Sequence, residues 1–216
     1  MTFASLMADL LGGLLVSVEI FVCTLALALP LGFAVALGRM SSKPVVAALF
    51  RILISVVRGT PLMLQIMFVY FAPYFLFGMP LSRYPRLLAT VFAFAINYAA
   101  YFAEIYRGGI LSIDVGQREA ATALGMGRAQ TFFRIILPQT VKRVIPAVGN
   151  EVITLVKDTS LAFTIAVTEM FTIAKQLSSA NTSMTPLVAA GVFYYLFNYA
   201  VAWTMERIEK HFAYYD

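Results

Sequence analysis

Long uncharged blocks separated by short charged segments constrain this chain more than any other feature of its sequence. A helix that spans a bilayer needs about 20 mostly apolar residues. Five stretches meet this requirement, at residues 10–38, 59–77, 87–103, 144–167 and 184–205. Only 12% of the residues are charged, against roughly 25% in an ordinary soluble domain. We therefore expect an all-α membrane protein in which residues 1–216 form one domain with five transmembrane helices.

The placement of Lys and Arg predicts how these helices are oriented. Cytoplasmic segments carry an excess of both residues, and most of the sixteen fall on one side if the N-terminus lies outside. The cytoplasmic set is then Arg39, Lys43, Arg51, Arg58, Arg107, Arg118, Arg128, Arg134, Lys142, Arg143, Arg207 and Lys210. The sequence thus predicts an N-out, C-in arrangement. Residues 43–57 fit either an interfacial helix or an inward extension of the second span.

The segment at residues 107–143, between the third and fourth expected spans, is long for a connection in a compact helical protein. From Gly116 onward it predicts a helix, a break at Gly125 and Gly127, and a second helix that ends at Pro138. The first helix carries small side chains, which permit close approach by another surface. A docking element for a soluble partner and a surface hairpin without a partner both fit this pattern.

Polar side chains recur at helical spacing within two of the expected spans. An ionisable group in the hydrocarbon region is costly unless it faces a protein interior or a watery cavity. The set in the fourth span is Asn150, Glu151, Thr154, Lys157 and Asp158, and the set in the third is Asn97, Tyr101 and Glu104. Each set falls on one helical face. We therefore predict a pathway between helices that offers the anionic, cationic and hydrogen-bonding groups an amino acid zwitterion requires.

Alternatives stay open at three of the candidate pathway residues. Gln65, in an otherwise apolar part of the second span, fits a pocket or a hydrogen bond to a neighbouring helix. Lys157 and Glu104 fit the pathway or an internal charge pair that serves as scaffolding.

The sequence also limits the chemistry of the chain. It contains no GxxxxGK[ST] motif, so it cannot bind and hydrolyse ATP alone. The single Cys23 and the single His211 cannot build a zinc site or a Ser-His-Asp triad. We therefore expect no enzyme activity, no metal and no cofactor in this chain. A membrane hydrolase that uses only Glu104, Glu151 and Asp158 is the remaining enzymatic interpretation.

Several motifs resemble the permease subunits of bacterial ABC importers, in particular the polar amino acid family of the histidine, glutamine, arginine and cystine type. In the long loop these are Glu119-Ala120-Ala121, then Gly125, then Ile135, Leu137 and Pro138. Elsewhere they are residues 58–61 (RGTP), 101–109 (YFAEIYRGG) and 157–161 (KDTSL). The resemblance covers nearly the whole chain.

This resemblance implies the type I ABC importer permease fold and a multi-pass location in the bacterial inner membrane. The implied contacts with the ATPase subunit, in the coupling loop, are Glu119, Ala120, Ala121, Gly125, Leu137 and Pro138. The implied partners are an ABC ATPase dimer that holds ATP and Mg, an extracytoplasmic binding protein, and a second permease copy or a paralogue, with a homodimer favoured. The implied cargo is a polar L-amino acid, glutamine-like or basic, with cystine as a further candidate.

A secondary carrier or channel driven by an ion gradient is the main alternative, with Glu104, Lys157 and Asp158 responding to the gradient. Carriers are often built from internal repeats, and the two halves of this sequence show no convincing repeat. A membrane adaptor that transports nothing would leave the polar stripe without a purpose. Nucleic acid is not an expected partner, because the basic residues do not form one solvated patch.

Two smaller features concern packing and the outer surface. Gly12, Gly13 and Gly32 are predicted to permit close approach of another helix. Residues 169–183 lie outside in the expected topology and include an amphipathic helix. That helix fits a role at the outer gate or against the binding protein, and it equally fits an ordinary connector.

Overall fold

The computed structural model describes residues 2–81 and 85–212, and the regular structure in these two ranges is helical. Three helices are long and apolar enough to cross a membrane: α1 (Phe3–Arg39), α4 (Arg86–Leu111) and α9 (Thr185–Phe212). The pair α2 (Pro44–Gly59) and α3 (Leu62–Phe77) qualifies as a fourth span if the two helices are counted together. The chain is therefore an all-helical membrane protein with three to four candidate spans.

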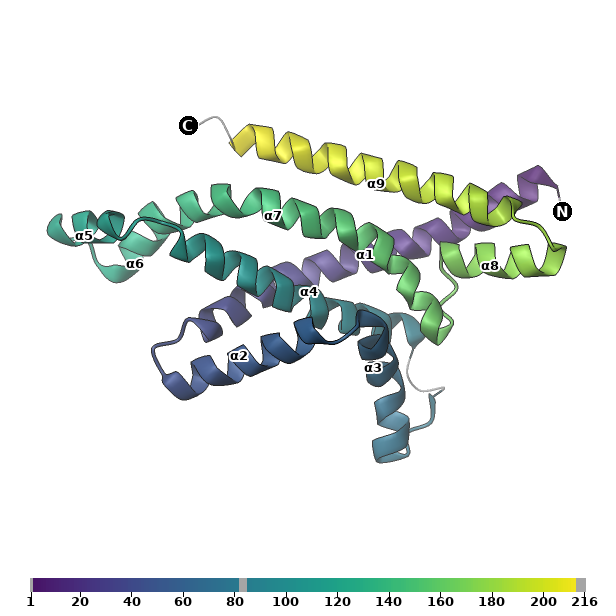
Figure 1. Ribbon diagram of the computed structural model, residues 1–216, viewed down its shortest axis with the longest axis horizontal. Helices are drawn as coiled ribbons and strands as arrows, with labels where there is room; N and C mark the ends of the chain where they lie inside the picture. The colour runs from purple at the N-terminus through teal and green to yellow at the C-terminus, as the bar shows by residue number, and fades with distance from the viewer. Residues whose placement is uncertain (1, 82–84, 213–216) are drawn as a thin grey trace.

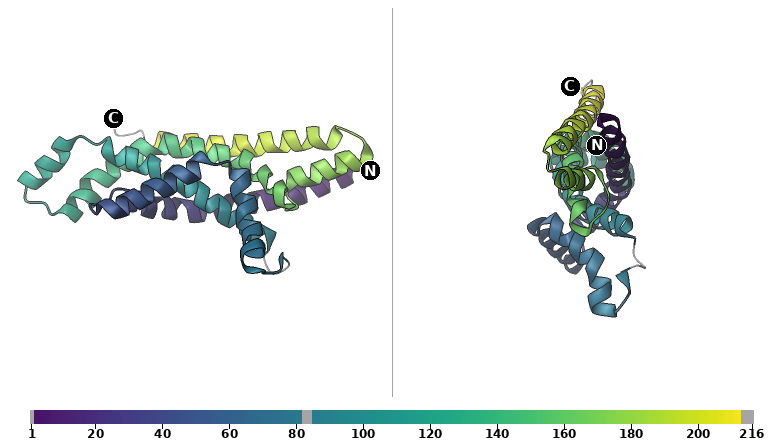
Figure 2. Two further views of the ribbon diagram at one scale, coloured as in Figure 1. Left: turned by 60° about the horizontal axis from the view of Figure 1, so that its bottom comes forward. Right: turned by 90° about the vertical axis from the view of Figure 1, so that its right-hand side faces the viewer.

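The long helices run side by side along the long axis of the molecule (Figure 1). The hairpin formed by α5 (Val115–Ala123) and α6 (Arg128–Thr131) lies at one end. The N-terminus and α8 (Met170–Asn181) lie at the other end, and α3 leaves the bundle sideways (Figure 2). The hairpin and α8 therefore lie at opposite ends of the bundle (Figure 1).

Helix α4 forms the centre of the bundle and contacts α1 more extensively than any other helix does. Its large side chains Phe94, Tyr98 and Phe102 are at most 2% exposed. Small residues allow α1 to lie close to it: a Cβ atom added at Gly32 would sit 2.8 Å from the Cβ of Phe102. The prediction of close approach is confirmed at Gly32.

The same prediction is confirmed at Gly13 and wrong at Gly12. A Cβ at Gly13 would lie 2.7 Å from the Cα of Met170 at the start of α8, whereas a Cβ at Gly12 would have no atom within 4 Å. The reason is helical periodicity, since two consecutive residues point about 100° apart and only one of them faces the neighbouring helix.

The second expected span does not form a straight helix over residues 59–77. Instead α2 ends at Gly59, α3 begins at Leu62, and the two axes are bent by 108°. Pro61 explains the break, because it has no N–H to donate and it forces the preceding Thr60 into an extended backbone. Residues 44–57 thus belong to the separate helix α2, with Lys43 as its N-cap, and α2 packs against α1 and α4 through the buried Ile54.

Helix α7 (Leu137–Asp158) and the 3-10 helix after it (Thr159–Ile165) occupy the place of the fourth expected span. Helix α7 lies against α4 and α9, yet it is not among the candidate spans. Its charged residues, including Lys142, Arg143 and Glu151, make it too polar by composition alone.

The prediction that a helix ends at Pro138 is wrong. The chain continues from α6 through a π-helical turn (Phe132–Ile136) directly into α7, and Pro138 lies in the first turn of α7. The turn that precedes this proline is π-helical, so the regular α-helical hydrogen bonding is already interrupted where the proline lacks an N–H. The predicted break at Gly125 and Gly127 is confirmed, since α5 ends at Ala123 and α6 begins at Arg128.

The amphipathic helix expected within residues 169–183 is α8, and the residue that begins it was not singled out by the sequence. Glu169 is fully buried and accepts hydrogen bonds from the backbone N–H groups of Phe171 and Thr172 and from the Tyr194 hydroxyl on α9. Burial raises the pKa of this carboxyl above its ordinary value. A single buried side chain thereby joins the start of α8 to α9.

Candidate functional site

The polar residues of α7 occupy one face of the helix, as their spacing predicts. Asn150, Thr154 and Lys157 are exposed, and Glu151 and Asp158 are half-buried. The residues between them pack inward: Gly149, Val152, Leu155 and Val156 are buried. The stripe is therefore the face of α7 that the rest of this chain leaves uncovered.

Asp158 connects the stripe to the centre of the bundle. Its Oδ2 atom accepts a hydrogen bond of 2.7 Å from the hydroxyl of Tyr98, a residue of α4 that is 2% exposed. Glu151, about two turns earlier on α7, interacts electrostatically with Asp158 and with Arg58 of α2. One side of α7, the end of α2 and the middle of α4 thus contribute to a single polar region.

The structure brings Gln65 and Asn97 together and gives both of them partners within the chain. The Asn97 side-chain amide donates to Oε1 of Gln65 over 3.0 Å. The Gln65 amide in turn donates to the carbonyl of Val57 over 2.7 Å and to the hydroxyl of Thr60 over 2.8 Å. These contacts join α4 to the bend between α2 and α3, so the alternative of a hydrogen bond to a neighbouring helix is present for Gln65.

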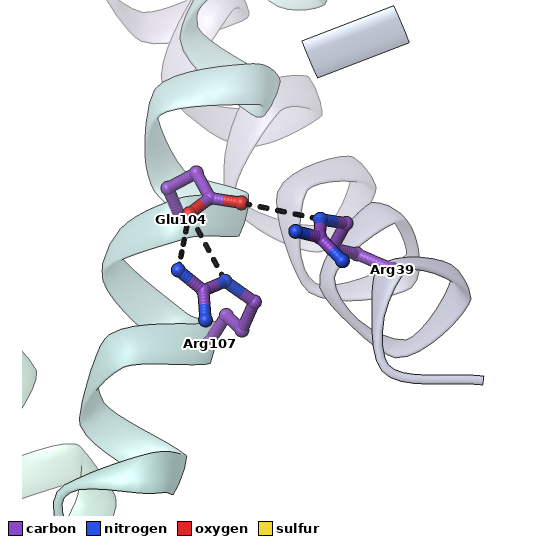
Figure 3. Close-up of polar contacts among 3 residues, drawn as sticks. All are labelled: Arg39, Glu104 and Arg107. Atoms are coloured by element: carbon purple, nitrogen blue, oxygen red, sulfur yellow. Dashed lines mark hydrogen bonds and ion pairs between the residues drawn. The ribbon is translucent and has the colours of Figure 1, made fainter. Parts of the chain in front are cut away.

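Glu104 lies in a cluster of charges near the end of α4 (Figure 3). Its carboxylate accepts hydrogen bonds of 2.6 and 3.0 Å from Arg107 and forms an ion pair of 3.8 Å with Arg39 at the end of α1. The sequence places Glu104 near Arg107, three residues along the same helix, but does not pair it with Arg39. The sequence does indicate that Arg39 and Arg107 lie at a similar depth in the membrane, because each follows an apolar span on the side predicted to be cytoplasmic.

A further cation lies beside Tyr101, a residue of the polar face predicted on the third span. The guanidinium carbon of Arg58 lies 5.0 Å from the centre of the Tyr101 ring, which is within the range of a cation–π contact. Since Arg58 also interacts electrostatically with Glu151, α2 brings a second positive charge to the stripe, in addition to that of Lys157. The sequence placed Arg58 in a family motif without assigning it to the pathway.

The second candidate region is the hairpin of α5 and α6. Asp114 caps α5 by accepting a hydrogen bond from the N–H of Gly116, and Gly125 turns the chain with a φ of +75°. Glu119, Ala120 and Gly125 are exposed, whereas Ala121 is 1% exposed and packs inside the hairpin. The two other residues expected to contact an ATPase, Leu137 and Pro138, lie beyond the hairpin in the first turn of α7.

The described residues 2–81 and 85–212 contain no group of three His, Cys, Asp or Glu side chains that could hold a metal ion. Two of the carboxylates considered for a hydrolase have other partners, with Glu104 bound to two arginines and Asp158 to Tyr98. The arrangement is suited to binding and passing a polar molecule. A bundle of apolar helices with one polar face, together with a hairpin at one end, fits the transmembrane subunit of a transporter.

Comparison with known proteins identifies which kind of transporter this is. The family model described as binding-protein-dependent transport system inner membrane component matches residues 28–214, and the chain belongs to this family. It is therefore a permease subunit in the inner membrane, and ATP hydrolysis and substrate capture belong to separate ATPase and binding-protein chains. Membership in this family confirms the ABC interpretation over that of a carrier driven by an ion gradient.

Individual relatives agree along most of their length. The L-cystine transport system permease protein TcyL of Bacillus subtilis is 38% identical, over 89% of this chain and 83% of its own. The arginine transport system permease protein ArtQ of the same organism is 35% identical, over 93% and 91%. A crystal structure described as an amino acid ABC transporter with histidines matches with a TM-score of 0.88 and 30% identity, over 98% of this chain and 99% of that one.

Proposed function

We propose that this chain carries a polar L-amino acid, glutamine-like or basic, with cystine as a further candidate. The observation that carries the proposal is the polar face of α7, on which Glu151 and Asp158 stand with Lys157. Relatives named as permeases for cystine and for arginine support the same class of cargo. An amino acid zwitterion needs an anion for its ammonium and a cation for its carboxylate, and this face provides both.

The proposed membrane arrangement has five spans with the N-terminus outside and the C-terminus inside. Helices α1, α4 and α9 are three of the spans, and the bent pair α2–α3 is the fourth. The fifth is α7 with its 3-10 extension, in which the ionisable residues face a pathway instead of lipid. The charges of Arg39, Arg107 and Arg207 at the inner ends of three spans support this orientation.

The proposed pathway contains Asn150, Glu151, Thr154, Lys157 and Asp158 on α7, with Asn97, Glu104 and Gln65 at its edge. Because the stripe lies on the uncovered face of α7, one chain supplies only half of a closed pathway. A second copy of this chain around a two-fold axis would complete it, and a homodimer is the simplest such assembly. Selection of the cargo is then shared between this face and the binding protein.

The proposed route of energy coupling is the loop at residues 107–143. Glu119, Ala120 and Gly125 present an exposed surface for a cleft of the ATPase subunit, and Ala121 supports that surface from inside the hairpin. Leu137 and Pro138 begin the helix that bears the polar stripe, so a displacement of the hairpin is passed to the pathway through α7. ATP and Mg bind to the ATPase partner, and this chain responds to the difference between its states.

The experiment that tests this function is uptake of labelled amino acids into vesicles that contain the chain, its ATPase and its binding protein. We expect accumulation that requires ATP and that is selective for one polar amino acid. Replacing Asp158 by Asn or Glu151 by Gln should reduce uptake by about tenfold or more, since each change removes an ionic contact with the cargo. Thr154→Ser, on the same face, is the matched control and should retain uptake.

Two results would contradict the proposal. Uptake that is equal without nucleotide would remove the importer mechanism. Unchanged uptake and selectivity in both carboxylate variants would return Glu151 and Asp158 to a scaffolding role.

A further inference from the structure

A cavity of about 450 Å³ lies behind the coupling hairpin, between the hairpin and the ends of two spans. Its walls come from the end of α1 and its C-cap (Leu37 and Met40), the end of α4 (Ile110), the hairpin and the π-helical turn that follows it. Its lining contains no residue of the polar stripe on α7, and it does not contain Glu119, Ala120 or Gly125 of the hairpin. The cavity therefore lies apart from the polar stripe, and it is lined by residues of the coupling loop other than those proposed to contact the ATPase.

The charged side chains that line this cavity are both cationic. Arg118 reaches it from α5 and Arg128 from the start of α6, and no described acidic residue lines it. Both arginines are exposed in the described structure, so neither charge is buried in an internal pair. Two guanidinium groups that line one cavity from different helices are suited to a phosphate, because each can donate two parallel hydrogen bonds.

The remaining lining is apolar and is held in place by a small core. Ile110 and Ile136 are both 2% exposed and pack with Met40 and Phe132. Leu37, in contrast, is 47% exposed and stands two residues before Arg39, where α1 ends. The cavity thus has a fixed apolar floor that continues onto an exposed apolar residue at the inner end of a span.

We propose that this cavity binds an anionic phospholipid of the inner leaflet, with the phosphate between Arg118 and Arg128 and the first part of an acyl chain against Leu37 and Met40. The proposal rests on the N-out, C-in arrangement, which places the hairpin beside the cytoplasmic leaflet. That leaflet is rich in anionic lipid and attracts basic residues near its surface. Free phosphate shares the charge but would leave the apolar half of the cavity unfilled.

A lipid in this position touches both the hairpin and the spans. Its phosphate would join α5 to α6, and its acyl chain would join the hairpin to α1 and α4. We therefore expect anionic lipid to stiffen the connection between the ATPase contact and the pathway. Coupling of ATP hydrolysis to transport should then depend on the lipid composition of the membrane.

The test uses the assembled transporter in nanodiscs of phosphatidylcholine, with or without phosphatidylglycerol, and counts retained lipids by native mass spectrometry. We expect one phosphatidylglycerol per permease chain to survive conditions that strip phosphatidylcholine. The Arg118→Gln/Arg128→Gln variant should lower this retention on the order of tenfold, as the loss of two charged hydrogen-bonding groups predicts. The Arg118→Lys/Arg128→Lys variant should restore part of it, because it keeps both positive charges.

The matched control is Arg134→Gln, because Arg134 is exposed on the adjacent π-helical turn but does not line the cavity. Equal retention in the double Gln variant and the wild type would overturn the proposal. So would displacement of the lipid by millimolar inorganic phosphate, which would indicate a site for free phosphate. Uptake of amino acid by the wild type is measured separately, so that loss of the lipid site and failure of the proposed transport function are told apart.

Discussion

The carboxylate of Glu104 connects two helices of this molecule. It binds Arg107 on its own helix and Arg39 at the end of α1, and its side chain is 19% exposed. The same residue was a candidate for the pathway, and its two arginine partners now supply a structural reason for its presence. Its two roles can be separated by experiment, because the ion pairs stabilise the fold whether or not cargo passes.

We predict that Glu104→Gln lowers the free energy of unfolding by about 1–3 kcal/mol, because it leaves two arginines without their anion. The measurement is the thermal midpoint of the purified permease in detergent. Glu206→Gln is the control, since Glu206 pairs with Lys210 on the exposed end of α9 and should leave the midpoint unchanged. Equal midpoints for wild type and Glu104→Gln would mean that the cluster does not hold α1 and α4 together.

At the scale of whole helices, close contacts decide how the helices pack against one another. Helix α1 meets the backbone of α8 at Gly13, while Gly12, its neighbour, points away from the rest of the chain. Because the two glycines are adjacent in the same helix, they share the same propensity and the same depth. They differ in what a methyl group would meet, which makes them a matched pair.

We predict that Gly13→Ala destabilises the permease by about 1–3 kcal/mol, because the new methyl group would lie 2.7 Å from the Cα of Met170. Gly12→Ala should be neutral or slightly stabilising, since alanine favours helix over glycine. Thermal unfolding in detergent compares the two variants with the wild type. A loss of stability of the same size in both variants would argue against a specific contact between α1 and α8.

The elements that the sequence predicts well are those that depend on local pattern. Apolar length located α1, α4 and α9, and helical spacing located the stripe on α7. The bend between α2 and α3 and the position of Pro138 were missed, because a proline can break a helix or begin one and the local sequence does not distinguish the two. The pairs Glu104–Arg39, Tyr98–Asp158 and Asn97–Gln65 were also missed, since each joins two helices whose relative position only packing decides.

At the scale of the whole molecule, the described chain leaves two unlike surfaces uncovered. The stripe on α7 is polar, whereas α3 presents Phe68, Phe75 and Phe77, which are 69–75% exposed. Lipid can cover an apolar helix but is a poor solvent for Glu151 and Asp158. The stripe is therefore the stronger argument for a second copy.

We predict that the active complex contains two copies of this chain. Native mass spectrometry of the complex with its ATPase should give a stoichiometry of two permease chains, and a tagged copy should retrieve an untagged one. An active complex with a single copy would require the pathway to be completed by a different chain.

The proposed contact between the hairpin and the ATPase can be tested at a single residue, Gly125. Its φ of +75° favours glycine, and a side chain there would meet nothing within 4 Å in this chain. Two explanations therefore exist for a glycine at this position. The turn requires a left-handed backbone, or the contact with the ATPase requires a surface without a side chain. Asparagine separates them, because it tolerates the left-handed conformation while adding a side chain.

We predict that Gly125→Asn folds normally but lowers ATP-driven uptake by about tenfold or more, since a clash in a closely packed interface costs ~1–3 kcal/mol. The control is Gly78→Asn, because Gly78 ends α3 with a φ of +64° and is equally open, but lies far from the hairpin. That variant should transport like the wild type. If Gly125→Asn also transports normally, the glycine serves the turn alone, and the contact with the ATPase must be carried by Glu119 and Ala120.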